Sequence, residues 1–148
     1  MISELFSFWS ILRILYSLIF ASTHGYILKF TKDIEAKKDC PLKDSWKVSN
    51  GKLLSSLLIV IAGINIFVPA SKFLSTLPII GSSYVLLFCL GLFGELFIVH
   101  RLAMDLTSEY KKQCKPKGYS FLIEFFENKG IMECSIYTMV LAMIFFYL

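Results

Sequence analysis

The chain of 148 residues is 56% hydrophobic and carries a formal net charge of +4. Its mean hydropathy of +0.67 is too high for an ordinary soluble domain, so we expect lipid as its solvent. At about 20 residues per crossing plus loops, the length gives one compact helical bundle and leaves no room for a separate soluble domain. The basic residues gather between apolar stretches, which excludes a basic stripe for nucleic acid.

Four apolar stretches are predicted to cross the membrane. In chain order they are residues 5–30, 53–74, 78–104 and 131–148. The first is expected to be a retained helix, because it lacks the basic start and the small-residue cleavage pattern of a signal peptide. The second and third form a tight helical hairpin with Pro78 near a helix start. The sequence therefore predicts an all-α polytopic membrane protein whose four transmembrane helices form a single domain, residues 1–148.

Two polar loops, residues 31–52 and 105–120, connect the spans at one end of this bundle. The segments 29–52 and 101–119 hold twelve of the fifteen Lys and Arg residues. The positive-inside rule then places this basic end in the cytosol, or in the matrix if the membrane is mitochondrial. Residues 121–130 carry apolar side chains at helical spacing, which predicts a short interfacial helix before the last span.

The four cysteines show no Cys-x-x-Cys pair and no Cys/His cluster. Cys40 and Cys114 lie in the polar loops, and Cys89 and Cys134 lie in apolar segments. We expect four free thiols that face a reducing compartment or lipid, and neither a metal nor a cofactor.

Four polar residues lie inside the predicted spans, where an ionisable group is costly and marks a functional candidate. They are Arg13, His24, Asn65 and Glu95. At about 1.5 Å per residue, His24 and Glu95 lie roughly 7 and 9 Å from the basic end, whereas Arg13 and Asn65 lie roughly 24 and 20 Å from it. We expect His24 to meet Glu95 and Arg13 to meet Asn65. Structural pairing, anchoring at lipid headgroups, and a proton or substrate site all stay open as roles.

Small residues predict where helices pack closely. Ser56, Gly63 and Ala70 recur every seven residues in the second span, and Gly91 and Gly94 lie in the third. In lipid, small residues let helices approach each other, and this approach is the source of packing energy.

A basic cluster is expected at the end of the third span and in the loop after it, at His100, Arg101, Lys111 and Lys112. Cations there can meet the helix dipole and anionic headgroups, or a quinone or phosphate. Nucleophile–base pairs, glycine-rich phosphate loops and the helical zinc motif are absent from the sequence. We therefore assign no catalytic residue and expect a protein that is not an enzyme.

Two stretches, Phe93–Ile98 (Phe-Gly-Glu-Leu-Phe-Ile) and Leu53–Ser56 (Leu-Leu-Ser-Ser), resemble the small four-span endoplasmic reticulum scaffold family of ergosterol biosynthesis. The order of spans and loops is also similar to that family. The resemblance implies a non-catalytic tether that gathers sterol C-4 demethylation enzymes in the endoplasmic reticulum membrane.

A third stretch, His100–Leu106 (His-Arg-Leu-Ala-Met-Asp-Leu), is similar to a helix end in the cytochrome b membrane anchor of succinate dehydrogenase. That resemblance implies a subunit of a respiratory complex in the mitochondrial inner membrane, in contact with quinone and haem. We expect membrane lipid and other membrane proteins of a complex as partners. The expected function is a scaffold or accessory subunit for lipid or sterol enzymes. A respiratory accessory subunit and a small transporter that uses His24 and Glu95 are the alternatives.

Overall fold

The computed structural model describes residues 7–108, 113–128, 134–135 and 137–142, and the regular elements within these ranges are helices. They are α2 (Phe8–Glu35), α3 (Trp46–Phe67), α4 (Ala70–Thr76), α5 (Pro78–Thr107) and α6 (Ser120–Glu127). Helices α2, α3 and α5 are long and apolar enough to cross a membrane. The expected all-α membrane protein is confirmed at this level.

The predicted fourth span, residues 131–148, falls largely outside the described residues. Residues 134–135 and 137–142 are helical, and Met139 and Ala142 are buried in the same apolar cluster as Phe20 of α2. This piece therefore packs on the bundle, and its crossing of a membrane stays a prediction. Helix α6 is the short helix expected before the last span, and its place in an interface also stays a prediction.

Serine caps fix where the first two long helices begin. The side chain of Ser7 accepts a hydrogen bond from the Ser10 amide, and that of Ser45 accepts one from the Val48 amide. Each serine thereby satisfies an amide that a helix start leaves without a partner. Because α2 runs on to Glu35 and α3 already begins at Trp46, the predicted polar loop of residues 31–52 shortens to residues 36–45.

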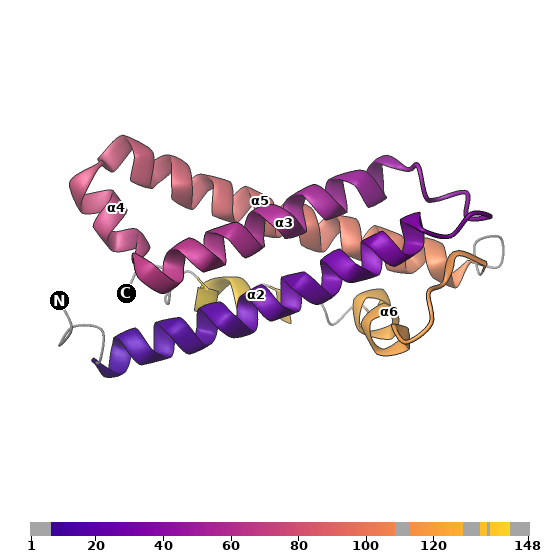
Figure 1. The fold of residues 1–148 in the computed structure, drawn as a ribbon, viewed down its shortest axis with the longest axis horizontal. Coiled ribbons are helices and arrows are strands. Elements are labelled where there is room, and N and C mark those ends of the chain that lie inside the picture. Colours follow the sequence, from indigo (N-terminus) through magenta and orange to yellow (C-terminus); the bar gives the residue numbers. More distant parts are fainter. Residues whose placement is uncertain (1–6, 109–112, 129–133, 136, 143–148) are drawn as a thin grey trace.

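The second long helix ends earlier than the predicted span of residues 53–74. Helix α3 stops at Phe67, and Val68 is extended with φ −132° and ψ 114°. Pro69 explains this break, because its ring disfavours helical geometry in the preceding residue and its nitrogen carries no hydrogen. The short helix α4 follows as a separate element and joins α3 to α5 at one end of the molecule (Figure 1).

The elbow between α4 and α5 requires a residue without a side chain. A Cβ added at Gly81 would lie 2.6 Å from the Leu74 backbone nitrogen. Real Cβ atoms do not come that close, so α4 can fold back on α5 only if position 81 is glycine.

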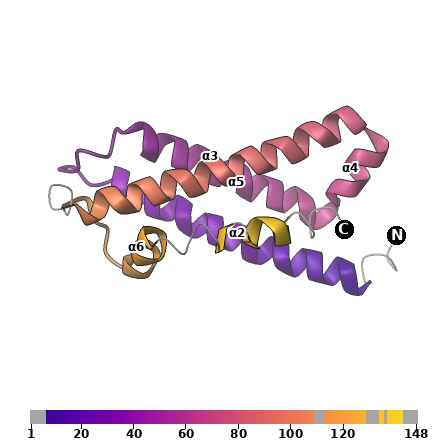
Figure 2. The same cartoon turned by 180° about the vertical axis from the view of Figure 1, so that it is seen from behind.

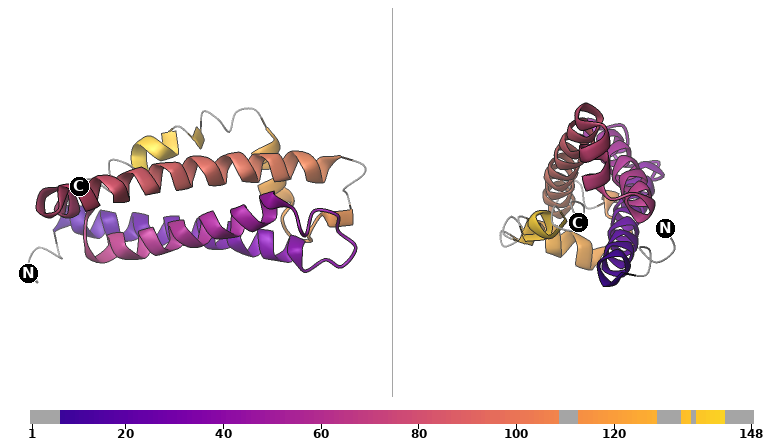
Figure 3. Two further views of the ribbon diagram at one scale, coloured as in Figure 1. Left: turned by 90° about the horizontal axis from the view of Figure 1, so that it is seen from above. Right: turned by 90° about the vertical axis from the view of Figure 1, so that its left-hand side faces the viewer.

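The three long helices lie side by side, with α2 packed on α3 and α3 packed on α5 (Figures 1 and 2). Helix α4 packs on α5 at one end of the bundle, and α6 packs on α5 near the other end, beside the loop 36–45. The end-on view shows the long helices surrounding a common interior (Figure 3). This arrangement brings side chains from distant parts of the chain to one level.

The interior holds two apolar clusters. One cluster lies toward the loop 36–45 and includes Ile27, Val48 and Ile98. The other lies toward α4 and includes Phe20, Leu58 and Leu92. Each of the three long helices contributes residues to both clusters. The buried polar residues of the described chain also lie on these helices.

The packing face predicted for the second span is wrong by one residue at two of its three positions. Ser56 is exposed, and a Cβ at Gly63 would meet nothing within 4 Å. Ala70 is fully buried in an apolar cluster, but it lies on α4 and not on the second span. The buried face of α3 instead follows a spacing of four, three, four and three residues, through Gly51, Ser55, Leu58, Ala62 and Asn65. The repeat of seven used for the prediction fits either face, so it does not choose between them.

The prediction for the third span agrees with the structure. A Cβ at Gly91 would touch the Leu58 side chain at 3.4 Å, and a Cβ at Gly94 would approach the Leu54 side chain to 2.9 Å. These two glycines therefore face α3 and allow it to come close.

Candidate functional site

The three long helices meet at Glu95, whose side chain is fully buried on α5. The Ser55 hydroxyl on α3 donates a hydrogen bond to Glu95 Oε1. His24 Nδ1 on α2 lies directly against Glu95 Oε2. We call Ser55, Glu95 and His24 the polar junction. The expected pairing of His24 with Glu95 is confirmed as a contact.

The polar junction joins helices because a carboxyl group in an apolar interior is stable only with partners. An unpaired polar group costs several kcal/mol in such surroundings. Ser55 is fully buried and His24 is 4% exposed, so neither is free to turn to solvent. A buried Glu–His pair of this kind connects helices, and it can also hold a proton.

A second buried polar contact lies nearer α4, where Arg13 meets Asn65 as expected. The Arg13 Nε donates to the Asn65 backbone oxygen at 3.1 Å, and the Asn65 amide donates to the Ser17 hydroxyl at 2.9 Å. In a continuing helix, the Asn65 carbonyl would accept from the amide of residue 69. Residue 69 is proline and has no N–H, so Arg13 supplies the missing donor.

A cavity of about 300 Å³ lies beside the polar junction. Its wall comes from α2, α5, α6 and the helical residues 134–135 and 137–142, and it is mostly apolar. The hydroxyls of Thr23 and Thr138 on this wall donate to backbone oxygens of their own helices. His24 also lines the cavity, so its imidazole lies between the cavity and Glu95.

The predicted basic cluster is only partly described, because Lys111 and Lys112 lie outside the described residues. His100 Nδ1 lies 2.6 Å from the Phe126 backbone oxygen, in the last turn of α6. This contact satisfies a carbonyl that a helix end leaves without a partner, so His100 ties α5 to α6. Arg101 is exposed, and its guanidinium lies 5.3 Å from the centre of the Phe97 ring.

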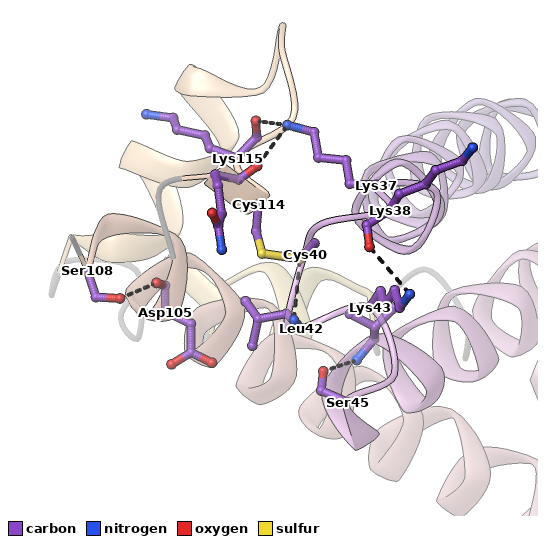
Figure 4. The surroundings of a disulfide bond; sticks show 12 residues. Lys37, Lys38, Cys40, Leu42, Lys43, Ser45, Asp105, Ser108, Cys114 and Lys115 are labelled. Atoms are coloured by element: carbon purple, nitrogen blue, oxygen red, sulfur yellow. Dashed lines mark hydrogen bonds between the residues drawn. A yellow bond between two sulfur atoms is a disulfide. The ribbon is translucent and has the colours of Figure 1, made fainter. Parts of the chain in front are cut away.

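The expectation of four free thiols is wrong at the basic end of the molecule. Cys40 and Cys114 form a disulfide, with Cα atoms 4.9 Å apart and a sequence separation of 74 (Figure 4). Both cysteines are buried, at 3% and 0% exposure. Cys89 and Cys134 are free. We call the loop 36–45 and the segment 113–119, joined by this bond, the stapled end.

Ion pairs and hydrogen bonds surround the disulfide. Lys47 on α3 pairs with Asp105 on α5 at 2.5 Å, which links the two helices beside the stapled end. The Lys37 ammonium donates to the backbone oxygens of Gln113 and Lys115, at 3.3 and 2.5 Å (Figure 4). These contacts join the same two chain segments that the disulfide joins, so the loops form one unit.

Tyr119 forms a further link between α2 and the segment before α6. Its hydroxyl donates to Asp33 at 2.6 Å, and its ring lies 5.3 Å from that of Phe30. Burial, together with the bond to Asp33, raises the pKa of Tyr119 well above its ordinary value. The neutral phenol is therefore the form that this contact holds.

The contacts that the sequence did not predict include those of Ser55 and Ser17 with the buried polar residues, and the disulfide. Ser55 lies on the buried face of α3, three residues before Leu58, and Ser17 lies one turn after Arg13 on α2. A search for hydroxyls one turn from a buried polar group could have found Ser17. The disulfide carries no local signal, because only the packed helices bring its two cysteines together.

Comparison with protein-family models, curated proteins and solved structures gave no match. The resemblances to the sterol scaffold family and to the succinate dehydrogenase anchor therefore stay predictions.

Proposed function

We propose that this chain is a non-catalytic membrane scaffold or accessory subunit that holds partner membrane proteins through its helix surfaces. The observation that carries this proposal is the polar junction. Glu95, the residue most costly to bury in lipid, accepts a hydrogen bond from Ser55 on α3 and lies against the His24 ring on α2. Arg13 donates a hydrogen bond to the Asn65 backbone oxygen on α3. Both groups thus connect helices of the bundle.

The outward faces of the helices supply the surface for partners. Large apolar side chains there are well exposed, among them Ile19 at 65%, Val60 at 59% and Leu90 at 61%. Ser56, Val60 and Gly63 follow one another on the outer side of α3 at helical spacing. Small residues on such a face allow a partner helix to approach closely, as bundle packing in lipid requires.

The partners we propose are membrane enzymes of lipid or sterol synthesis in the endoplasmic reticulum. The test is purification of the tagged full chain in mild detergent, with identification of what accompanies it and of its membrane. Stoichiometric lipid or sterol enzymes would support the proposal. Subunits of a respiratory complex would establish the mitochondrial alternative, and a protein that purifies alone would contradict both.

Two glycine variants sharpen this test. A Cβ at Gly63 or at Gly25 would meet nothing within 4 Å, so a leucine side chain at either position starts into open space. If the outer face of α3 binds the partner, Gly63→Leu lowers partner recovery several-fold at unchanged protein amount. Gly25→Leu on α2 is the matched control and should recover the partner normally.

The cavity beside His24 favours a second candidate function, which is binding or transport of a small apolar molecule. The His24 imidazole offers a polar contact on a cavity wall that is otherwise mostly apolar. Thr23→Phe would fill this cavity from α2 without removing a contact between helices, because the Thr23 hydroxyl bonds only its own helix at Ile19.

Ser22→Phe is the matched control for that variant, since Ser22 does not line the cavity and its hydroxyl bonds its own helix in the same way. A scaffold keeps its partners in both variants. A binding protein or transporter loses activity in Thr23→Phe alone.

A further inference from the structure

Two observations about the stapled end disagree on which side of the membrane it lies. The segments 29–52 and 101–119 hold twelve of the fifteen Lys and Arg residues, and such a bias marks the cytosolic or matrix side. The same segments hold Cys40 and Cys114, which form a disulfide. Disulfides persist in oxidising compartments and are rare where thiol systems keep cysteines reduced.

The disulfide is part of the packing at this end. Both half-cystines are buried in the apolar cluster that also holds Leu42, Val48 and Leu122. Lys37 bridges the same two segments through backbone oxygens (Figure 4). The two free cysteines, Cys89 and Cys134, lie in helical segments and not in these loops. The cysteines thus divide into a bonded pair at the loops and free thiols in the helices.

For the orientation in the membrane, the disulfide is stronger evidence than the distribution of basic residues. The positive-inside rule describes a statistical preference during insertion, and added charges elsewhere can overturn it. Lys47 and Lys52 on α3 are moreover paired with Asp105 and Glu35. A disulfide between two loops, in contrast, must be made by an oxidant on the side where both loops lie.

We propose that the stapled end faces an oxidising compartment, namely the lumenal, external or intermembrane-space side of its membrane, opposite to the expectation from charge. The bond forms by thiol–disulfide exchange with a disulfide carrier protein of that compartment. The thiolate of one cysteine attacks the carrier disulfide, and the thiolate of the other displaces the carrier. Two electrons and two protons pass to the carrier, which leaves as a dithiol.

This orientation determines where each end of the molecule meets its partners. Helix α4, with Lys72, lies at the end opposite the loop 36–45 (Figure 1) and so faces the reducing side. A partner domain that contacts the basic loops must then lie in the oxidising compartment. The orientation holds independently of the proposed scaffold function, since it depends on the disulfide alone.

Lysines at the two ends provide the test without any mutation. Lys38 lies exposed at the stapled end, and Lys72 lies exposed on α4. Sealed vesicles with the reducing side outward are treated with a membrane-impermeant amine reagent, before and after detergent, and the modified lysines are located by peptide mass. We expect Lys72 to react before detergent and Lys38 only after it. Reaction of Lys38 before detergent, with Lys72 protected, would overturn the proposal.

A count of thiols in the same membranes tests the bond itself. After acid quenching and denaturation, a maleimide should modify Cys89 and Cys134 without reductant, and Cys40 and Cys114 only after reduction. Cys40→Ser should make Cys114 reactive without reductant. Cys89→Ser, the matched control, should leave the bonded pair unchanged. Free Cys40 and Cys114 thiols in the native chain would also overturn the proposal, whether or not partners purify with it.

Discussion

At the scale of the residue, the buried polar side chains act as connectors, and part of this was predictable. Counting residues from the basic end placed His24 level with Glu95 and Arg13 level with Asn65, because helices translate sequence spacing into depth. The atoms in contact could not be predicted. Arg13 binds the backbone oxygen of Asn65, and the reason lies four residues further on, at Pro69.

Arg13→Met should destabilise the bundle by about 1–3 kcal/mol, since it leaves the Asn65 carbonyl buried without a donor. Pro69→Ala restores an N–H that can serve this carbonyl, so Arg13→Met should cost less in that background. Thermal unfolding of the four proteins in detergent measures the difference. Lys38→Met, at an exposed position, is the control for loss of charge alone. Equal cost in both backgrounds would show that the proline plays no part.

Tyr119 gives the pH dependence of the stapled end. Its pKa is raised in the folded chain, so the phenol binds its proton more tightly there than in the unfolded chain. Its contribution to stability is therefore complete below about pH 10, the ordinary tyrosine value, and is lost as the pH rises above it.

Tyr119→Phe should lower the melting temperature at neutral pH, because the bond to Asp33 is lost. It should also flatten the fall in melting temperature above about pH 10. The matched control is Tyr137→Phe, because Tyr137 is 71% exposed. An equally steep alkaline fall in the Tyr119 variant and the native chain would contradict this account.

At the scale of the element, apolar runs predicted the existence of the long helices, and their ends depended on local chemistry. Serine caps begin α2 and α3, and Pro69 ends α3 within the predicted span 53–74. The packing face of α3 was missed because Ser55 and Ser56 are adjacent small polar residues, and a count of small residues cannot choose between them. The hydrogen bond from Ser55 to Glu95 on α5 shows that Ser55 lies on the buried face.

Gly81→Ala tests the elbow between α4 and α5. Because the new Cβ would lie 2.6 Å from backbone, α4 must move, and we expect a loss of at least 2 kcal/mol, roughly the cost of severe overpacking. Gly63→Ala is the matched control, since its Cβ meets nothing. Thermal unfolding in detergent compares the two. Equal melting temperatures would show that the elbow tolerates a side chain.

At the scale of the whole molecule, composition predicted a helical membrane protein, and the order of spans predicted that both polar loops share one end. The disulfide between these loops could not be predicted, since its cysteines have a sequence separation of 74. Because it closes so long a loop, replacing Cys40 and Cys114 by serine should cost about 2–4 kcal/mol. Thermal unfolding beside Cys89→Ser measures that cost, and equal stability would contradict it.

Glu95 on α5 connects to α3 through Ser55 and to α2 through His24. A double-mutant cycle between Glu95→Gln and His24→Phe tests the contact with α2 most directly. Each single change removes a partner from the contact, so each should destabilise the bundle by about 1–3 kcal/mol. The double change should cost less than their sum by about 0.5–1.5 kcal/mol, because the contact can be lost only once. Strictly additive losses, measured by thermal unfolding in detergent, would contradict the claim.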